Sequence, residues 1–149
     1  MGLDMHLTKE IYVAAQYPHR KVKLNVGLTI EDNLIKIDAS NVQSITEQAA
    51  YWRKANAIHG WFVENVQYGS DDCDRYGVEL SELKDLLNTC RTVISTKDTS
   101  LLPPMGGTDI DDGYWNNLKY TEETLNKLIT EHEENDYNMD ISYFYHSSW

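Results

Sequence analysis

Apolar and polar side chains alternate along the first part of this chain and again near its end, and the segments between follow the period of an α-helix. Alternation predicts half-buried strands over residues 3–13 and 22–30, and a short third strand over 34–37. Residues 41–51 fit either a helix or a strand. Residues 139–146 alternate again and predict a last strand.

Three central segments carry apolar residues at helical spacing. They predict helices over residues 52–66, 80–94 and 114–129, with a loop over 67–78. Strands followed by three helices and one further strand are typical of the α+β class, with a mostly antiparallel sheet. The length of 149 residues suits a single domain over residues 1–149.

The charge of the chain limits its partners. It has 24 Asp and Glu against 13 Lys and Arg, a formal charge of −11. The excess lies in residues 61–149, which hold eighteen acidic and six basic residues. Because proteins bind nucleic acids by neutralising phosphates with Lys and Arg, we expect no direct contact with nucleic acid. An acidic surface can attract a basic partner protein, or can serve only as a solvated face.

Cysteine content and hydropathy bear on the compartment. Two cysteines, Cys73 and Cys90, are too few for a disulfide framework. The first residues include Asp4 and His6 and form no apolar leader, and no stretch approaches the ~20 apolar residues that span a bilayer. We therefore expect a soluble, cytoplasmic protein that does not contact a membrane.

The segment from residue 52 to residue 61 concentrates groups that bind nucleotides. On the expected helix, basic, amide and imidazole side chains share neighbouring sides among aromatic rings. Arg and Lys donate to phosphates, Asn bonds a base edge, and Trp or Tyr stacks on a purine. The alternative is that the rings belong to the core and the cations are solvated or paired. The candidate ligand-binding residues are Trp52, Arg53, Lys54, Asn56 and His59, joined by Tyr143, Tyr145 and Trp149 from the aromatic end of the chain.

An acidic loop offers other chemistry. Asp71, Asp72 and Asp74 surround Cys73, so the loop could ligate Mg²⁺ or Ca²⁺, or present a cysteine nucleophile with His59 as its base. The spacing matches no zinc pattern, and loop capping accounts for the carboxylates more simply. We expect no catalytic residue, no metal and no cofactor.

A second acidic cluster precedes the third expected helix. Asp109, Asp111 and Asp112 lie where acidic residues favour a helix N-terminus. They are also the candidate contacts for a basic partner protein.

Distinctive motifs run along the chain at residues 1–5 (MGLDM), 51–67, 71–73 (DDC), 107–109 (GTD) and 143–149. In these motifs the chain resembles a group of short, uncharacterised proteins encoded by bacteriophages, prophages and gut bacteria. The resemblance implies a phage accessory protein acting in the host cytoplasm, and it implies no particular activity. The chain departs from the pattern at Pro104-Met105-Gly106, where relatives carry several Phe. If this loop shapes a ligand pocket, its specificity differs here.

Three functions fit these observations. The first is a phage protein that counters host defence by sequestering a small nucleotide signal, without catalysis. The second is an acidic mimic of nucleic acid that inhibits a host nuclease, of the anti-CRISPR or anti-restriction type. The third is a small nucleotide hydrolase. An exposed aromatic end would favour a homo-oligomer with a pocket between subunits.

Overall fold

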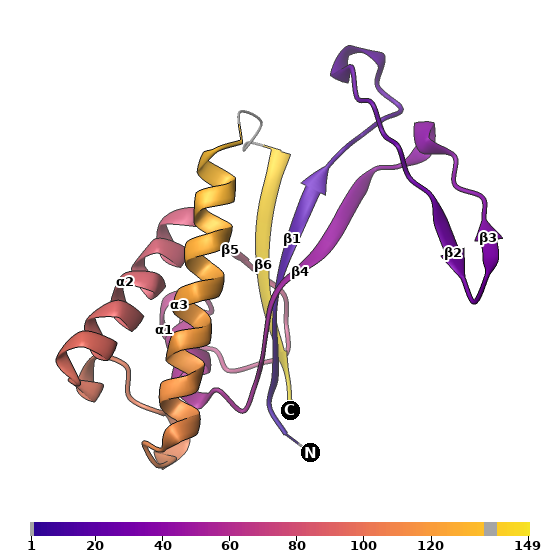
Figure 1. Ribbon diagram of the computed structural model, residues 1–149. Helices are drawn as coiled ribbons and strands as arrows, with labels where there is room; N and C mark the ends of the chain where they lie inside the picture. The colour runs from indigo at the N-terminus through magenta and orange to yellow at the C-terminus, as the bar shows by residue number, and fades with distance from the viewer. Residues whose placement is uncertain (1, 136–139) are drawn as a thin grey trace.

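The computed structural model describes residues 2–135 and 140–149, and its centre is a four-stranded antiparallel sheet (Figure 1). The strands are β1 (Asp4–Tyr12), β4 (Ser44–Arg53), β5 (Tyr76–Val78) and β6 (Ile141–Ser148), in the order β4-β1-β6-β5. Three helices, α1 (Asn56–Asn65), α2 (Leu80–Thr96) and α3 (Asp112–Glu133), cover one face of this sheet. We call the sheet and its helices the body. Every strand pairing among the described residues is antiparallel, and the α+β class is confirmed.

A two-stranded sheet stands apart from the body (Figure 1). It consists of β2 (Leu28–Ile30) and β3 (Asn33–Ile35), within residues 15–42, which we call the arm. Two short 3-10 helices, Pro18–Arg20 and Ala39–Asn41, also lie in the arm. No residue of the arm is buried.

The alternation of β1 produces the face of the sheet that the helices cover. Met5 and Leu7 are fully buried. Beside them in register lie Trp52 and Ala50 of β4, and Tyr145 of β6, all buried. Side chains two apart share one face of a strand, so one apolar face of three strands meets the helices.

The helices bury the apolar stripes that their sequences predict. Phe62 of α1 stacks on Tyr145, with ring centroids 3.9 Å apart and planes 5° apart. At the start of α2, the side chains of Glu79 and Glu82 each accept a hydrogen bond from the other's backbone N–H, which is a capping box. Two further 3-10 helices, Thr99–Leu101 and Met105–Gly107, connect α2 to α3. The buried residues of α2 are Leu83, Leu86, Leu87, Cys90 and Val93.

The helix predicted over residues 52–66 begins later than expected, so the placement of its first residues was wrong. Trp52 and Arg53 are the last residues of β4, and Lys54 turns the chain with a left-handed φ of 55°. Helix α1 then starts at Asn56. Pairing with β1 decides this boundary, since Trp52 lies opposite Met5 on the buried face.

Residues 41–51, which the sequence left open between a helix and a strand, form a strand from Ser44 onward. Two other predictions need correction. The predicted strand over 22–30 is reduced to Leu28–Ile30, and neither of its faces is buried. The predicted loop over 67–78 contains β5, which pairs with β6. The third strand, predicted over 34–37, is confirmed in part and lies at Asn33–Ile35. The last strand is confirmed, although Met139 lies outside the described residues.

Candidate functional site

A cleft of about 420 Å³ lies where β4 passes into α1. One wall comes from the turn after β4 and the first residues of α1, and the other from the connection to α3 and the start of that helix. We call it the Arg53 cleft. Its polar and charged lining residues are Arg53, Lys54, Asn56, Thr108, Asp109, Asp111, Tyr114 and Asn117.

The turn into α1 leaves helix donors beside this cleft. The backbone N–H of Lys54 donates to the carbonyl of Leu3 at 2.7 Å, which ties the turn to the start of the chain. Lys54 forms this turn with a positive φ of 55°, which is uncommon for a residue with a side chain. The N-cap is Ala55, which makes no side-chain cap, and none of the described side chains is hydrogen-bonded to the N–H groups of the first turn of α1. The N–H groups at the start of a helix have no partner within it, so this end of α1 presents positive partial charge to the cleft.

The cationic wall is accessible. The Arg53 side chain is 65% exposed, and its Nε lies 3.9 Å from Oδ1 of Asp4. That carboxylate oxygen also accepts a hydrogen bond from the Tyr51 hydroxyl. Lys54 forms no ion pair with the described residues. Both cations are therefore able to meet a ligand.

The opposite wall is acidic. Asp111 is the N-cap of α3, and its Oδ1 accepts the backbone N–H of Tyr114 at 3.0 Å. Asp109 lines the same wall. Asn56 reaches across, because its Nδ2 donates to Oγ1 of Thr108 at 3.5 Å. The cleft is thus positive on one side and negative on the other.

A second, more open hollow of about 380 Å³ adjoins the first. Asn56 lines both, and we call the second one the Trp149 groove. Trp149 is 58% exposed. Met105 lies against α1 here, since a Cβ on Gly60 would stand 3.3 Å from the Cβ of Met105. The remaining lining residues are Leu3, His59, Asp71 and Gly106.

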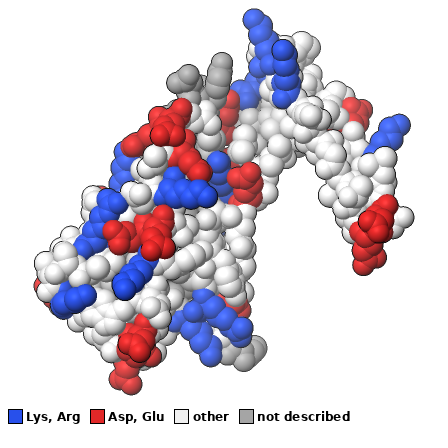
Figure 2. All heavy atoms as spheres, viewed as in Figure 1, with Lys and Arg blue, Asp and Glu red and all other residues white. Residues whose placement is uncertain are grey.

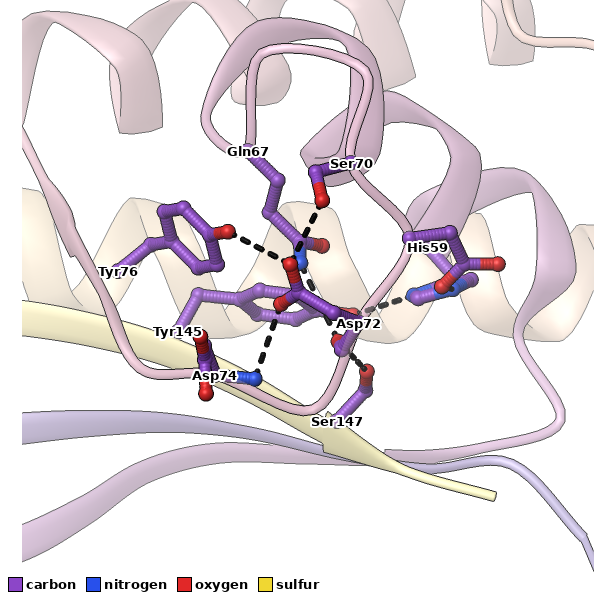
Figure 3. Close-up of polar contacts among 9 residues, drawn as sticks. His59, Gln67, Ser70, Asp72, Asp74, Tyr76, Tyr145 and Ser147 are labelled. Atoms are coloured by element: carbon purple, nitrogen blue, oxygen red, sulfur yellow. Dashed lines mark hydrogen bonds and ion pairs between the residues drawn. The ribbon is translucent and has the colours of Figure 1, made fainter.

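His59 forms the buried side of this groove. Figure 3 shows its polar contacts. Its Nε2 lies 3.0 Å from Oδ1 of Asp71, and its Nδ1 lies 2.7 Å from the hydroxyl of Tyr145. A carboxylate only accepts hydrogen bonds, so Nε2 carries the proton and, in the neutral ring, Nδ1 accepts from Tyr145. Burial raises the pKa of Tyr145 and keeps its hydroxyl protonated. Both imidazole nitrogens are occupied, which leaves His59 holding Asp71 in position.

The acidic loop after α1 is organised around Asp72 (Figure 3). Its carboxylate accepts hydrogen bonds from the Ser70 hydroxyl, the Tyr76 hydroxyl and the backbone N–H of Asp74, at 2.7, 2.8 and 3.0 Å. These bonds, that from Ser70 above all, lower the pKa of Asp72. Cys73 is exposed and free. In the described part of the chain, no group of three or more His, Cys, Asp or Glu side chains is arranged to hold a metal ion.

The structure brings together only part of the predicted ligand site. Arg53, Lys54 and Asn56 line the cleft, and Asn56, His59 and Trp149 line the groove. The other three candidates lie in the core: Trp52 donates from Nε1 to Oγ1 of Thr121 at 2.9 Å, Tyr143 bonds Nδ1 of His132 at 2.9 Å, and Tyr145 is covered by Phe62.

The predicted partner contacts are not a separate surface. Asp109 and Asp111 share the cleft with Arg53, whereas Asp112 is exposed in the first turn of α3 and does not line it. Asp111 is committed to capping α3.

The contribution of Thr108, Tyr114 and Asn117 to the cleft was not predicted, because nothing in the sequence brings the start of α3 to the start of α1. The segment Pro104-Met105-Gly106 was named above as a loop that could shape a ligand pocket. Pro104 lines the cleft, and Met105 and Gly106 line the groove.

No protein-family model, curated protein sequence or solved structure matches the chain. Among the described residues, none of the helices has the length and apolar character needed to cross a membrane.

Proposed function

We propose that the chain binds a small nucleotide-type ligand across the Arg53 cleft and the Trp149 groove, without converting it. As a phage accessory protein, it would counter host defence by removing a nucleotide signal from the cytoplasm. The observation that carries this proposal is that the cleft with the cationic wall and the groove with the exposed indole adjoin each other, since Asn56 lines both.

The phosphate end of the ligand fits the wall formed by Arg53 and Lys54. Guanidinium and ammonium groups donate charge-assisted hydrogen bonds to phosphate oxygens. The uncapped first turn of α1 lies between them and the groove, and helix N-termini favour anions. Phosphate bound here would replace the loose contact of Arg53 with Asp4.

The base of the ligand fits the Trp149 groove. The indole of Trp149 is more than half exposed, and Met105 and Leu3 supply apolar surface in the same groove. A purine stacked on the indole would bury apolar surface that is otherwise exposed to water. Asp71 lies in the groove with its Oδ1 bonded to His59, and its other oxygen can accept an amino group of a base.

The acidic wall restricts which nucleotides fit. Asp109, and the carboxylate oxygen of Asp111 that does not cap α3, can accept hydrogen bonds from ribose hydroxyls and base amino groups. Both carboxylates repel additional phosphates. We therefore expect cyclic nucleotides and ADP-ribose-type molecules to bind more tightly than nucleoside triphosphates, which carry more negative charge.

The groups that line the two hollows support binding rather than catalysis. His59 has both ring nitrogens occupied, and the hydroxyl that it contacts belongs to the buried Tyr145. A general base needs a nitrogen within reach of the proton that it removes. A hydrolase would need His59 to abandon one of these bonds.

Calorimetric titration with cyclic dinucleotides, cyclic trinucleotides, ADP-ribose-type signals and nucleoside triphosphates tests the proposal. Arg53→Ala should weaken binding by about 10- to 100-fold, which corresponds to about 1.5–3 kcal/mol for a hydrogen bond to a charged group. Trp149→Ala should weaken nucleotide binding by about 1–3 kcal/mol, because the base loses its stacking on the indole. Chromatography of the recovered ligand should return it unchanged.

Arg91→Ala is the matched control. Arg91 lies on α2 and contacts Glu122 and Asn126 of α3, so its removal deletes the same cation far from the cleft. Binding should stay within about twofold of the wild type, since a single surface charge at this distance is screened by salt. Absence of heat across the whole panel would remove the proposal, and chemical change of the ligand would replace it with the hydrolase hypothesis.

The acidic-mimic hypothesis finds less support. On the face drawn in Figure 2, acidic and basic side chains are interspersed over the helices rather than gathered by sign. Ion pairs join them, such as Lys84 with Glu133 and Arg91 with Glu122. A mimic of nucleic acid would need its carboxylates unpaired and arrayed along one surface.

A further inference from the structure

The arm exposes apolar side chains that none of the residues described by the structure covers. Fifteen large hydrophobic residues are exposed among those that the structure describes, and seven of them lie in the arm, which is less than a fifth of the sequence. Figure 1 shows β2 and β3 extending away from the body with no element against them. The seven are Tyr17, Val22, Val26, Leu28, Ile30, Leu34 and Ile35.

The hairpin of the arm has one apolar face. Leu28 pairs with Ile35, and Ile30 pairs with Asn33, so Leu28, Ile30 and Ile35 share a face. Thr29 pairs with Leu34 on the opposite face. Ile30 is 55% exposed and Ile35 is 42% exposed. An isolated two-stranded hairpin is marginal in water, so this face requires a cover.

The surface area of the chain supports the same conclusion. A folded monomer of 17.2 kDa exposes about 7,800 Å², whereas this chain exposes 9548 Å². The excess of roughly 1,700 Å² is about twice what each partner buries in an interface of standard size.

The base of the arm is fixed to the body by polar contacts. Nη1 of Arg20 pairs with Asp140 at 2.9 Å, and Nη2 donates to the carbonyl of Tyr12 at 2.8 Å. The backbone N–H of Ala15 donates to the carbonyl of Val42 at 3.1 Å and closes the base of the arm.

We propose that the apolar face formed by Leu28, Ile30 and Ile35 packs against the same face of a second copy of this chain. The arm carries four basic and three acidic residues, whereas the rest of the chain carries nine basic and twenty-one acidic residues. Contact through the nearly neutral arms keeps the two acidic bodies apart, which limits their repulsion. Two apolar sheet faces that pack together about a two-fold axis form an isologous interface.

Measurement of the mass in solution tests the dimer. Light scattering on the full chain should give twice the mass of 17.2 kDa. The measurement covers about 1 to 100 µM, which is roughly the range in which such interfaces associate. Ile35→Glu should raise the dissociation constant of the dimer by at least about 100-fold, because it buries an unpaired charge. Leu34→Glu introduces the same charge one residue away on the other face, and should change that constant by less than about threefold.

The outcomes separate the partners that the arm could have. A wild-type chain with the mass of a monomer at every concentration would overturn the proposal, and cosedimentation of that monomer with anionic phospholipid vesicles would assign the face to a membrane instead. A dimer that both substitutions weaken equally, or that Ile35→Glu leaves intact, would also overturn it. Near-ultraviolet circular dichroism of each variant checks that the body stays folded. We expect it to, because no side chain of the arm is buried.

Discussion

The body and the arm use the same sequence pattern with opposite results. In β1, Met5 and Leu7 alternate with polar residues and are 0% exposed. In the arm, Leu28 and Ile30 alternate with Thr29 and are 40% and 55% exposed. The difference is that α1, α2 and α3 cover the sheet of the body, whereas none of the described elements covers the hairpin. Alternation thus defines the two faces of a strand, but the covering of a face depends on elements elsewhere in the chain or in a partner.

The largest contrast is expected between apolar truncations in the two regions. Phe62→Ala should lower the free energy of unfolding by about 3–5 kcal/mol, because Phe62 is fully buried between Trp52, Trp61 and Tyr145. Leu34→Ala, in the arm, should change it by less than about 0.5 kcal/mol, since Leu34 is 78% exposed. Urea unfolding at one fixed protein concentration measures both. Similar losses for the two variants would mean that Leu34 is buried in solution.

A smaller contrast concerns one buried polar contact. Thr121 is fully buried, and its Oγ1 accepts the Nε1–H of Trp52 at 2.9 Å. Thr121→Val keeps the shape but leaves this indole N–H without an acceptor, which should cost about 1–3 kcal/mol. Urea unfolding checks the loss.

Thr130→Val is the control for that substitution. Both threonines donate to the carbonyl four residues earlier, at 2.7 Å for Thr121 and 2.8 Å for Thr130. Thr130 is exposed and accepts no bond from Trp52, so its replacement should cost less than about 0.5 kcal/mol. An equal loss for both variants would show that the contact with Trp52 contributes nothing.

The fold could be predicted from the sequence wherever the apolar spacing of one segment is continuous. The α2 stripe is such a case, because its apolar residues from Leu83 to Val93 keep one helical period and are buried together. The start of α1 is the opposite case. Ala55, Ile58 and Phe62 have helical spacing that runs back through Trp52, and only the pairing of Trp52 with Met5 assigns that residue to β4. Pairings between residues far apart in sequence leave no local mark.

The candidate site was predictable to the extent that its residues are neighbours in sequence. Arg53, Lys54 and Asn56 line one cleft as a local cluster. Tyr145 was expected at the ligand but meets His59 inside the core, since a strand sends alternate residues to opposite faces and Tyr145 is on the buried one. The wall formed by Asp109 was expected on a partner surface, because the position of α3 against α1 is a tertiary property.

The aspartates before α3 provide a contrast of intermediate size. Asp111→Ala removes the N-cap that accepts the backbone N–H of Tyr114, and should cost about 1 kcal/mol of unfolding free energy. Asp109→Ala, two residues earlier in the same cleft, should cost less than about 0.5 kcal/mol, because Asp109 is exposed and caps no helix. Thermal unfolding of the two variants measures the difference. A larger loss of unfolding free energy for Asp109→Ala than for Asp111→Ala would mean that Asp109, and not Asp111, is the N-cap of α3.

The smallest expected effect is the pH dependence that buried imidazoles give to the body. Burial, with a further contribution from Lys9 and Lys84 against the opposing effect of Glu133, lowers the pKa of His132, whose Nδ1 contacts the Tyr143 hydroxyl. The unfolded chain therefore binds a proton at a pH where the folded chain does not, so stability is complete above the ordinary pKa of about 6.5 and falls as the pH drops below it.

The free energy of unfolding should decrease between pH 7.5 and pH 5.5, in roughly the range where histidine titrates and well above the ordinary pKa of a carboxylate. His132→Gln should reduce this decrease without abolishing it, because burial also lowers the pKa of His146. An equal decrease in His132→Gln and in the wild type would show that the imidazole of His132 does not cause it.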